Sequence, residues 1–431
     1  MKRTLLPALA GALLVGCGSA DGVAPLPDVT DANALDVIDS AVEDAPVADV
    51  PVHLPSPVYP AFRPTAPTVA NSGGPVLRAP HIVPIFVASS ATTTWPDEMS
   101  ELDFMRRYMA SETWRTQVAE YGIGAGSVAD AIHSDGAGLA SGTVTATRLR
   151  AWVLAQIERG LWGAPDDNSL YVLMLDPRRM VSSGSDVTCR GIGGYHSDVS
   201  GIDRRAIAYA VIPDCGEGID TLTRVLSHEI LEAATDPYPN SAPAWAQPST
   251  ATPPEGAWAI AYTGGELGDM CEHRSDSTVR PDDVGYDVSR SWSNRAASEM
   301  QDPCVPTYGA SVYFNSAPSL PDVVTLTNRT RTGTVASHGL VLPVGGSRTI
   351  DVSLFSTAPT RGVWRVSARE LNFDGASPAF SFRWDHTSGF NGDVLHLTIT
   401  ATDEAPEGRA FQITSSLNRV STDWVGALAT E

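Results

Sequence analysis

The chain has 431 residues and carries 50 acidic against 29 basic side chains, a formal net charge of −21 at pH 7. A surface this acidic repels phosphate backbones and anionic lipid headgroups, and it attracts divalent cations. We therefore expect no nucleic-acid partner.

The first residues have the pattern of a bacterial lipoprotein signal. Lys2 and Arg3 precede an apolar run over residues 5–15, which is too short to remain as a transmembrane helix, and small residues lead to Cys17. We expect residues 1–16 to be cleaved and Cys17 to be acylated, so that a lipid is the only membrane anchor. Glycine follows Cys17, which favours the outer membrane, with the protein in the periplasm or on the cell surface.

Residues 17–70 are expected to form an extended tether. Ala, Val, Pro and Asp dominate this stretch, and its first basic residue is Arg63. A segment with few aromatic anchors and almost only acidic charges repels itself and cannot bury enough apolar surface to fold. We therefore expect the tether to be disordered and to hold the folded part away from the membrane.

From residue 71 the pattern changes to amphipathic helices and short strands. The apolar spacing predicts helices over residues 98–121, 145–159 and 219–235, and strands over residues 75–87, 170–175, 191–196 and 206–212. Asp220 is expected to cap the last helix, and Asp236-Pro237 to end it. This order is similar to the zincin arrangement, in which a mixed sheet and a backing helix support an active-site helix. We predict a zincin-like α+β domain over residues 71–305.

The last of these helices carries the most informative motif. His228, Glu229 and Glu232 form a His-Glu-x-x-Glu pattern, which is the zinc-hydrolase signature with its second histidine replaced by glutamate. Because positions i and i+4 share a helix face, His228 and Glu232 can bind one cation, with Glu229 beside its bound water. The carboxylate ligand makes the metal a weaker Lewis acid than a second imidazole would. The alternative interpretation is a solvated helix face.

A zinc site on this helix needs a third protein ligand from elsewhere in the chain. A later glycine-rich segment is dense in oxygen ligands, and we expect Asp269, or else Glu266, to supply it. Glu272 and His273 are further candidates. His196, on a predicted strand, would serve as a ligand, as the partner of a ligand, or as the group that stabilises an oxyanion. Alternatively, the two preferred carboxylates are solvated loop residues.

Four cysteines remain besides the lipid-bearing one, and an exported chain is expected to pair an even number of them. Of the three possible connectivities, we prefer Cys189 with Cys215 and Cys271 with Cys304. The first pair would tie the strand region to the start of the metal-type helix, and the second would fix the acidic segment. Zinc ligation by cysteine competes with this interpretation but lacks a Cys-x-x-Cys motif.

Beyond residue 305 the chain switches to short alternating runs. Residues 363–368, 380–384, 395–399 and 411–413 place apolar side chains at alternate positions, and Gly-Gly, Asp-Gly and Asn-Gly turn signals lie between such runs. The pattern predicts an antiparallel, all-β, Ig-like sandwich over residues 306–431. It contains no catalytic constellation, so binding, spacing, capping and a purely structural role all remain open for it.

Six segments together resemble the phosphate-induced, Exordium-like family over about residues 71–305. They are Asn71 to Leu77, Glu120 to Gly126, Leu170 to Leu175, Cys189 to His196, Ser227 to Pro237 and Glu266 to Glu272. The last two are the most specific. The resemblance implies an extracellular protein, associated in plants with the cell wall and growth control, without a settled activity. It puts these residues at motif positions: His228, Glu229, Glu232, Glu266, Asp269, Cys271 and Glu272.

The leading hypothesis is a zinc-dependent, peptidase-like hydrolase displayed as a lipoprotein. His228, Glu232 and a downstream carboxylate would hold the zinc, Glu229 would act as general base, and His196 would steady the oxyanion. A peptide or a cell-wall glycan is the expected ligand. The rival hypotheses are a non-catalytic binding or structural protein whose zinc or calcium only stiffens the fold, and a degenerate domain without metal. Serine-type catalysis is disfavoured, because no Gly-x-Ser-x-Gly elbow occurs.

Overall fold

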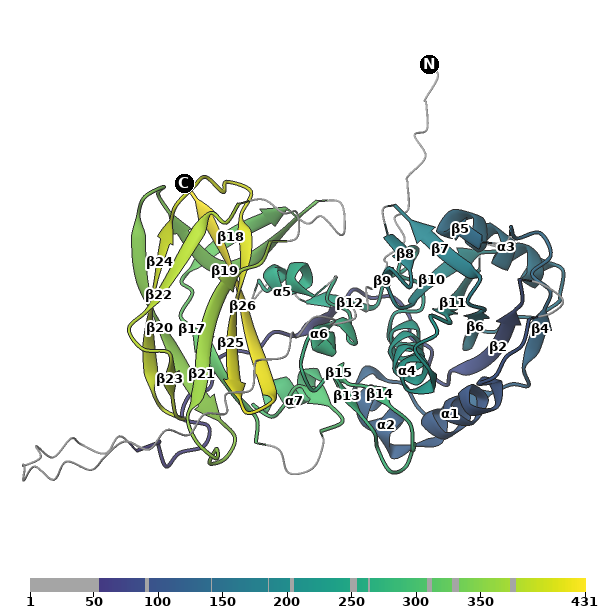
Figure 1. Ribbon diagram of the computed structural model, residues 1–431, viewed down its shortest axis with the longest axis horizontal. Helices are drawn as coiled ribbons and strands as arrows, with labels where there is room; N and C mark the ends of the chain where they lie inside the picture. Colours follow the sequence, from purple (N-terminus) through teal and green to yellow (C-terminus); the bar gives the residue numbers. More distant parts are fainter. Residues whose placement is uncertain are drawn as a thin grey trace, which may run out of the picture.

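The computed structural model describes residues 54–89, 93–140, 142–184, 186–201, 205–248, 254–262, 264–307, 312–327, 333–372 and 377–431. The expected signal peptide, Cys17 and most of the expected tether lie outside these ranges. Helix accounts for 19% and strand for 39%, so the protein is mixed α+β and rich in β-structure, as predicted. Figure 1 shows an α/β part and a β-sandwich, with short helices between them.

The α/β part is built on a mixed sheet with the strand order β10-β11-β6-β2-β3, and β4 also pairs with β2. Its strands are β2 (His81–Val87), β3 (Ser127–Val128), β4 (Ile132–Ser134), β6 (Ser169–Leu175), β10 (Tyr195–Ser200) and β11 (Ala206–Pro213). All neighbours pair in parallel except β10, which is antiparallel to β11 and forms one edge. The continuous apolar runs of β2 and β6 follow from this arrangement, because strands covered on both faces need no polar side.

Helices cover both faces of this sheet. They are α1 (Glu98–Ala110), α2 (Glu112–Val118), the short 3₁₀ helix η1 (Ala119–Tyr121), α3 (Ala146–Glu158) and α4 (Ile219–Thr235). Leu170, Val172 and Met174 of β6 enter the core that contains α1, α2 and α4, whereas Tyr171 and Leu173 enter the core under α3. The alternation of side chains along a strand therefore separates α4 from α3 by the thickness of the sheet.

A second small sheet lies next to α3. It has the order β5-β7-β8-β9, formed by β5 (Gly142–Thr145), β7 (Arg179–Ser183), β8 (Asp186–Thr188) and β9 (Gly191–Ile192). The strand predicted over residues 191–196 is thus two strands, β9 and the start of β10. The division places His196 on the edge of the main sheet.

Two predicted helix features differ in the structure. The helix expected over residues 98–121 divides at Ser111, whose Oγ accepts a hydrogen bond from the N–H of Trp114 at 2.9 Å and so caps α2. Apolar spacing continues across the division and did not reveal it. Asp220 does not cap α4, because Gly218 occupies the N-cap position. Asp220 instead forms an ion pair with Arg280.

The C-terminal part is a sandwich of two sheets, with the orders β17-β20-β24-β22 and β18-β19-β26-β25-β21-β23. Their bounds are β17 (Phe314–Pro318), β18 (Asp322–Thr327), β19 (Thr334–Leu342), β20 (Ser347–Ser356), β21 (Trp364–Glu370), β22 (Phe380–Trp384), β23 (Ser388–Gly389), β24 (Val394–Ala401), β25 (Arg409–Leu417) and β26 (Val420–Thr430). The predicted β-sandwich is therefore present. Its one parallel pair among the described strands is β19 with β26.

Short elements join the two parts, and one of them carries a residue of the candidate site. They are β1 (Val69–Asn71), β12 (Trp245–Pro248), α5 (Gly256–Ala261), α6 (Asp269–Glu272), β13 (Thr278–Val279), β14 (Val288–Ser289), β15 (Ser291–Trp292), α7 (Asn294–Ser298) and β16 (Cys304–Val305). Trp258 of α5 lies 6.0 Å from Trp424 of the sandwich, measured between ring centroids, and belongs to the core that also contains α4. The α/β part and the sandwich thus share one continuous apolar core.

Ordered contacts begin before the expected boundary at residue 71. The N–H of Ser56 donates to the carbonyl of Asn391 at 2.8 Å, and that of Ala61 donates to the Asn391 side chain at 3.0 Å. β1 pairs with β12. The end of the expected tether is therefore held against the folded parts. Within the described ranges, no helix combines the length and apolar character needed to cross a bilayer.

Candidate metal centre

The motif helix α4 presents its polar face to the interior. His228 is 2% exposed and Glu229 and Glu232 are 0% exposed. The alternative of a solvated helix face is therefore wrong. The segment of residues 264–272, called the ligand segment below, is equally enclosed, since Glu266 is 1% and Asp269 0% exposed. Glu266 and Asp269 are therefore not solvated loop residues either.

One group of possible ligands forms around His228. Its Nε2 lies 3.2 Å from Oε1 of Glu232 and 3.8 Å from Oδ1 of Asp269. One donor atom from each of the three residues lies within 4.8 Å of the others, close enough to share a cation. The spacing of i and i+4 on α4 brings the first two together, and the fold supplies the third.

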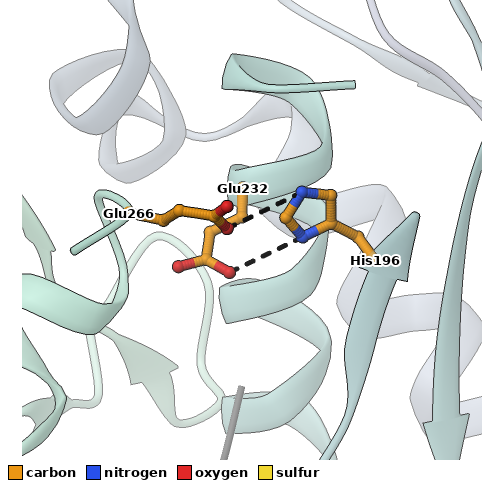
Figure 2. Close-up of side chains that lie close together, drawn as sticks. All are labelled: His196, Glu232 and Glu266. Carbon is orange, nitrogen blue, oxygen red and sulfur yellow. Dashed lines mark ion pairs between the residues drawn. The ribbon is translucent and has the colours of Figure 1, made fainter. Parts of the chain in front are cut away.

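A second group forms around His196 on the edge strand β10. Figure 2 shows its two ring nitrogens facing the carboxylates of Glu232 of α4 and Glu266 of the ligand segment. Nδ1 of His196 lies 3.7 Å from Oε2 of Glu232 and 3.8 Å from Glu229, and Nε2 lies 3.7 Å from Glu266. His196, Glu232 and Glu266 again offer donor atoms within 4.8 Å of one another. Glu232 therefore belongs to both groups, with one oxygen facing each.

The other two candidate ligands lie outside both groups. His273 stacks on Tyr262 with ring centroids 5.6 Å apart, and neither Glu272 nor His273 belongs to a set of converging ligands. The structure thus brings together six of the eight residues considered from the sequence: His196, His228, Glu229, Glu232, Glu266 and Asp269.

Backbone contacts fix the ligand segment against α4. Oε1 of Glu232 accepts hydrogen bonds from the N–H groups of Gly268 at 3.1 Å and Asp269 at 3.2 Å. A Cβ atom at Gly268 would lie 2.7 Å from Cε1 of His228 and 2.8 Å from Oε1 of Glu232. Only glycine fits there without displacing a ligand. A glycine between two candidate ligands is the signal that could have indicated this position in the sequence.

A second glycine packs against the opposite side of the motif. A Cβ atom at Gly194 would lie 2.8 Å from Val225 and 3.0 Å from Oε1 of Glu229. Beside it, a pocket of about 90 Å³ is lined by Gly193, Val225 and the disulfide of Cys189. Gly194 therefore packs directly against Glu229 and follows a residue that lines this pocket.

Burial and like charges dominate the electrostatics of the centre. Burial raises the pKa of the Glu232 carboxyl well above its usual range, and the neighbouring Glu266 and Glu229 raise it further. The pKa of Asp269 is raised in the same way, first by burial and then by Glu232 and Glu266. For His196, burial alone would lower the pKa, but the surrounding carboxylates outweigh it and raise the pKa to about 10. The carboxyl groups of the centre are thus buried and close to one another, a situation that a bound cation would relieve.

Several polar atoms of the centre have no hydrogen-bond partner. They include both carboxylate oxygens of Glu229, both ring nitrogens of His196, Nε2 of His228, Oε2 of Glu232 and Oδ1 of Asp269. An unsatisfied buried polar atom costs about 1–3 kcal/mol, so such a concentration needs a compensating ligand. Imidazole and carboxylate donors suit zinc, whereas calcium takes only oxygen ligands. The residues therefore fit a divalent transition metal better than calcium.

Two disulfides support the centre, and they pair as predicted. Cys189 bonds to Cys215, which lies just before α4. Cys271, inside the ligand segment, bonds to Cys304, which lies further along the chain. Two disulfides fit an oxidising, extracellular compartment.

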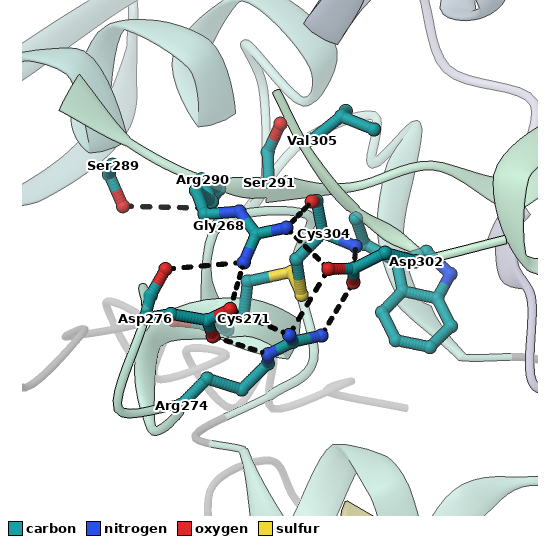
Figure 3. Close-up of a disulfide and its surroundings, with 12 residues drawn as sticks. Gly268, Cys271, Arg274, Asp276, Ser289, Arg290, Ser291, Asp302, Cys304 and Val305 are labelled. Carbon is teal, nitrogen blue, oxygen red and sulfur yellow. Dashed lines mark hydrogen bonds and ion pairs between the residues drawn. A yellow bond between two sulfur atoms is a disulfide. The ribbon is translucent and has the colours of Figure 1, made fainter. Parts of the chain in front are cut away.

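The second disulfide lies in a cluster of buried ion pairs, shown in Figure 3. Asp302 accepts hydrogen bonds from Arg274 at 2.6 Å and from Arg290 at 2.7 Å, and Asp276 binds the same two arginines. Burial would raise the pKa of Asp302, but the two guanidinium groups outweigh it and lower that pKa. The ligand segment is thus anchored on its C-terminal side by a covalent bond and a charged cluster.

No protein-family model matches the chain, and no curated protein matches it. Among solved structures, the surface layer protein SbsC, domains 1–6, aligns with 26% of this chain over 13% of its own length, with 12% identity and a TM-score of 0.16. A chimeric titin Z1Z2 aligns with 21% of this chain over 84% of its own length, with 15% identity and a TM-score of 0.15. Each likeness covers a minor part of this chain, and the site rests on its own geometry.

Proposed function

We propose that this chain is an exported, zinc-dependent hydrolase with a zincin-like α/β part. The observation that supports it best is the convergence of His228, Glu232 and Asp269 from two elements into one buried set of donor atoms. The helix over a mixed sheet with an antiparallel edge strand agrees with the zincin-like order expected from the sequence. The lipoprotein signal, the Exordium-like resemblance and the peptide or glycan ligand remain parts of this proposal.

Each residue of the centre has a distinct task in this proposal. A zinc ion on His228, Glu232 and Asp269 would supply Lewis acidity and lower the pKa of a water molecule. Glu229, whose two oxygens have no other hydrogen-bond partner, accepts the proton of the attacking water. His196, whose Nδ1 lies 3.8 Å from Glu229, would steady the oxyanion of the substrate. The backbone N–H groups of the ligand segment hold Glu232 in its ligating position.

Substitution of Glu229 tests the proposal. Glu229→Gln keeps the shape of the side chain but removes the base, so turnover of labelled casein should fall by about 10²–10⁴-fold while zinc content stays at the parent value. His273→Gln is the matched control, because this residue lies outside both ligand groups, and it should keep full activity. A Glu229→Gln variant as active as the parent would refute the general-base assignment.

The burial of the centre favours a second candidate function, a metal that only stiffens an extracellular binding protein. None of the six side chains is more than 2% exposed, so a substrate needs an opening to reach them. In that case chelation should lower the unfolding temperature, and Glu229→Gln should leave the zinc-loaded protein unchanged in every assay. Under the hydrolase proposal, the same variant loses turnover without losing zinc.

A further inference from the structure

Glu232 is the only residue of the centre that faces both histidines. Its Oε1 lies 3.2 Å from Nε2 of His228, and its Oε2 lies 3.7 Å from Nδ1 of His196. A carboxylate that turns one oxygen to each of two ligand sets has the geometry of a bridge between two metal ions. The single zinc of the proposed function uses only one of these oxygens.

The set around His196 is a built site rather than a chance collection of acids. Its members come from a strand, a helix and a loop, namely β10, α4 and the ligand segment. His196 is 1% exposed, and neither ring nitrogen has a hydrogen-bond partner. An imidazole that is buried without a hydrogen bond at either nitrogen, and aimed at carboxylates 3.7 Å away, is placed as a metal ligand would be.

The charge of the enclosed centre also calls for two cations. Glu229, Glu232, Glu266 and Asp269 are four buried carboxylates. One divalent ion beside His228 would leave the carboxylates around His196 without a cation. Two divalent ions balance all four carboxylates with both imidazoles neutral, which is the form in which histidine binds metals.

We propose that His196, Glu232 and Glu266 bind a second zinc ion, bridged through Glu232 to the ion held by His228 and Asp269. This inference rests on the proposed function, because it takes the first zinc site as given. Paired metals in hydrolases lie about 3.5–4 Å apart and stabilise both the attacking and the leaving oxygen. His196 is then a metal ligand rather than an oxyanion donor.

Counting the metal tests the inference without any need for a substrate. The full chain is loaded with Zn²⁺, dialysed and analysed for zinc per chain, beside His196→Ala, His228→Ala and the surface control His396→Ala. We expect two zinc ions in the parent and in the control, and one in each of the other two variants. The zinc that remains in each single variant shows that α4 is still folded.

Three outcomes overturn the inference. One zinc in both the parent and His196→Ala removes the second site and leaves the proposed function intact. Two zinc ions in His196→Ala place the second ion elsewhere. A parent without zinc removes the proposed function first, and the second site with it.

A second variant replaces His196→Ala if that protein does not fold, and a cobalt experiment tests whether Glu232 bridges the two ions. If His196→Ala loses its circular dichroism, Glu266→Gln takes its place and is expected to hold one zinc. Cobalt-loaded parent should show magnetic coupling between two ions, and this coupling should vanish in Glu232→Ala. Uncoupled cobalt in a parent that binds two ions would refute the bridging role of Glu232.

Discussion

Gly268→Ala perturbs the metal centre without removing a ligand. The glycine has φ −71° and ψ −47°, a helical conformation that alanine adopts freely, and alanine keeps the N–H that donates to Glu232. The added methyl group would lie 2.7 Å from His228 and 2.8 Å from Glu232, whereas ordinary contacts begin at 3.4 Å. The two ligands must therefore separate from the ligand segment by about 0.7 Å, the difference between these distances.

A displacement of this size is large for a metal site, where bond lengths vary by only about 0.2 Å. We expect the affinity for zinc to fall by about 10–100-fold, the range seen when the partners of metal ligands are altered. The assay is competition with a chromophoric chelator at fixed pH and ionic strength.

Gly124→Ala provides the matched control. Its methyl group would lie 3.5 Å from the carbonyl of Arg78, an ordinary contact, so its affinity for zinc should equal that of the parent. The unfolding temperature of both metal-free variants shows whether the fold survives. A stable Gly268→Ala protein with the parent's affinity for zinc would show that His228 and Glu232 are not ligands in the arrangement seen here.

Two further predictions concern stability. Burial, and then nearby carboxylates, raise the pKa of Glu101 from 4.5 to about 8, so the folded state favours the protonated form and loses stability as the pH rises between these values. Glu101→Gln should match the parent at pH 5 and exceed its free energy of unfolding by on the order of 5 kcal/mol at pH 9, measured by urea unfolding. The same difference between variant and parent at both pH values would contradict the shift. Replacing Cys271 and Cys304 by alanine should cost about 3–4 kcal/mol, given their sequence separation of 33, and should weaken zinc binding because it frees the ligand segment. Replacing Cys189 and Cys215 should cost a similar amount of stability but lower the affinity for zinc less. Equal affinities for zinc in the two double variants would show that the Cys271–Cys304 disulfide has no special role in holding the ligand segment.

The features that depend on local spacing could be predicted from the sequence. The helix that carries His228 and Glu232 follows from its apolar period, and the shared face of these residues follows from the helix geometry. The period of two in the C-terminal runs gave the sandwich in the same way. Ser111 was missed, because a serine cap inside a continuous apolar pattern changes no period.

The features that depend on distance between elements could not be predicted. Asp269 and Glu266 are three residues apart, and only the folded ligand segment shows that one faces His228 and the other His196. The place of His196 also depends on how β10 pairs with β11, since a shift of one residue would turn its side chain to the other face. Sequence reasoning gave the members of the site but not their partition into two groups.

The apolar core shared by α5 and the sandwich limits how this protein can evolve. Trp258 and Trp424 meet across the border between the two parts, within the core that also contains α4. A module with a polar outer surface can be gained, lost or exchanged by recombination at little cost. Here each part buries apolar side chains against the other, so loss of the sandwich would expose them, and a chain without it would need compensating polar substitutions on α5.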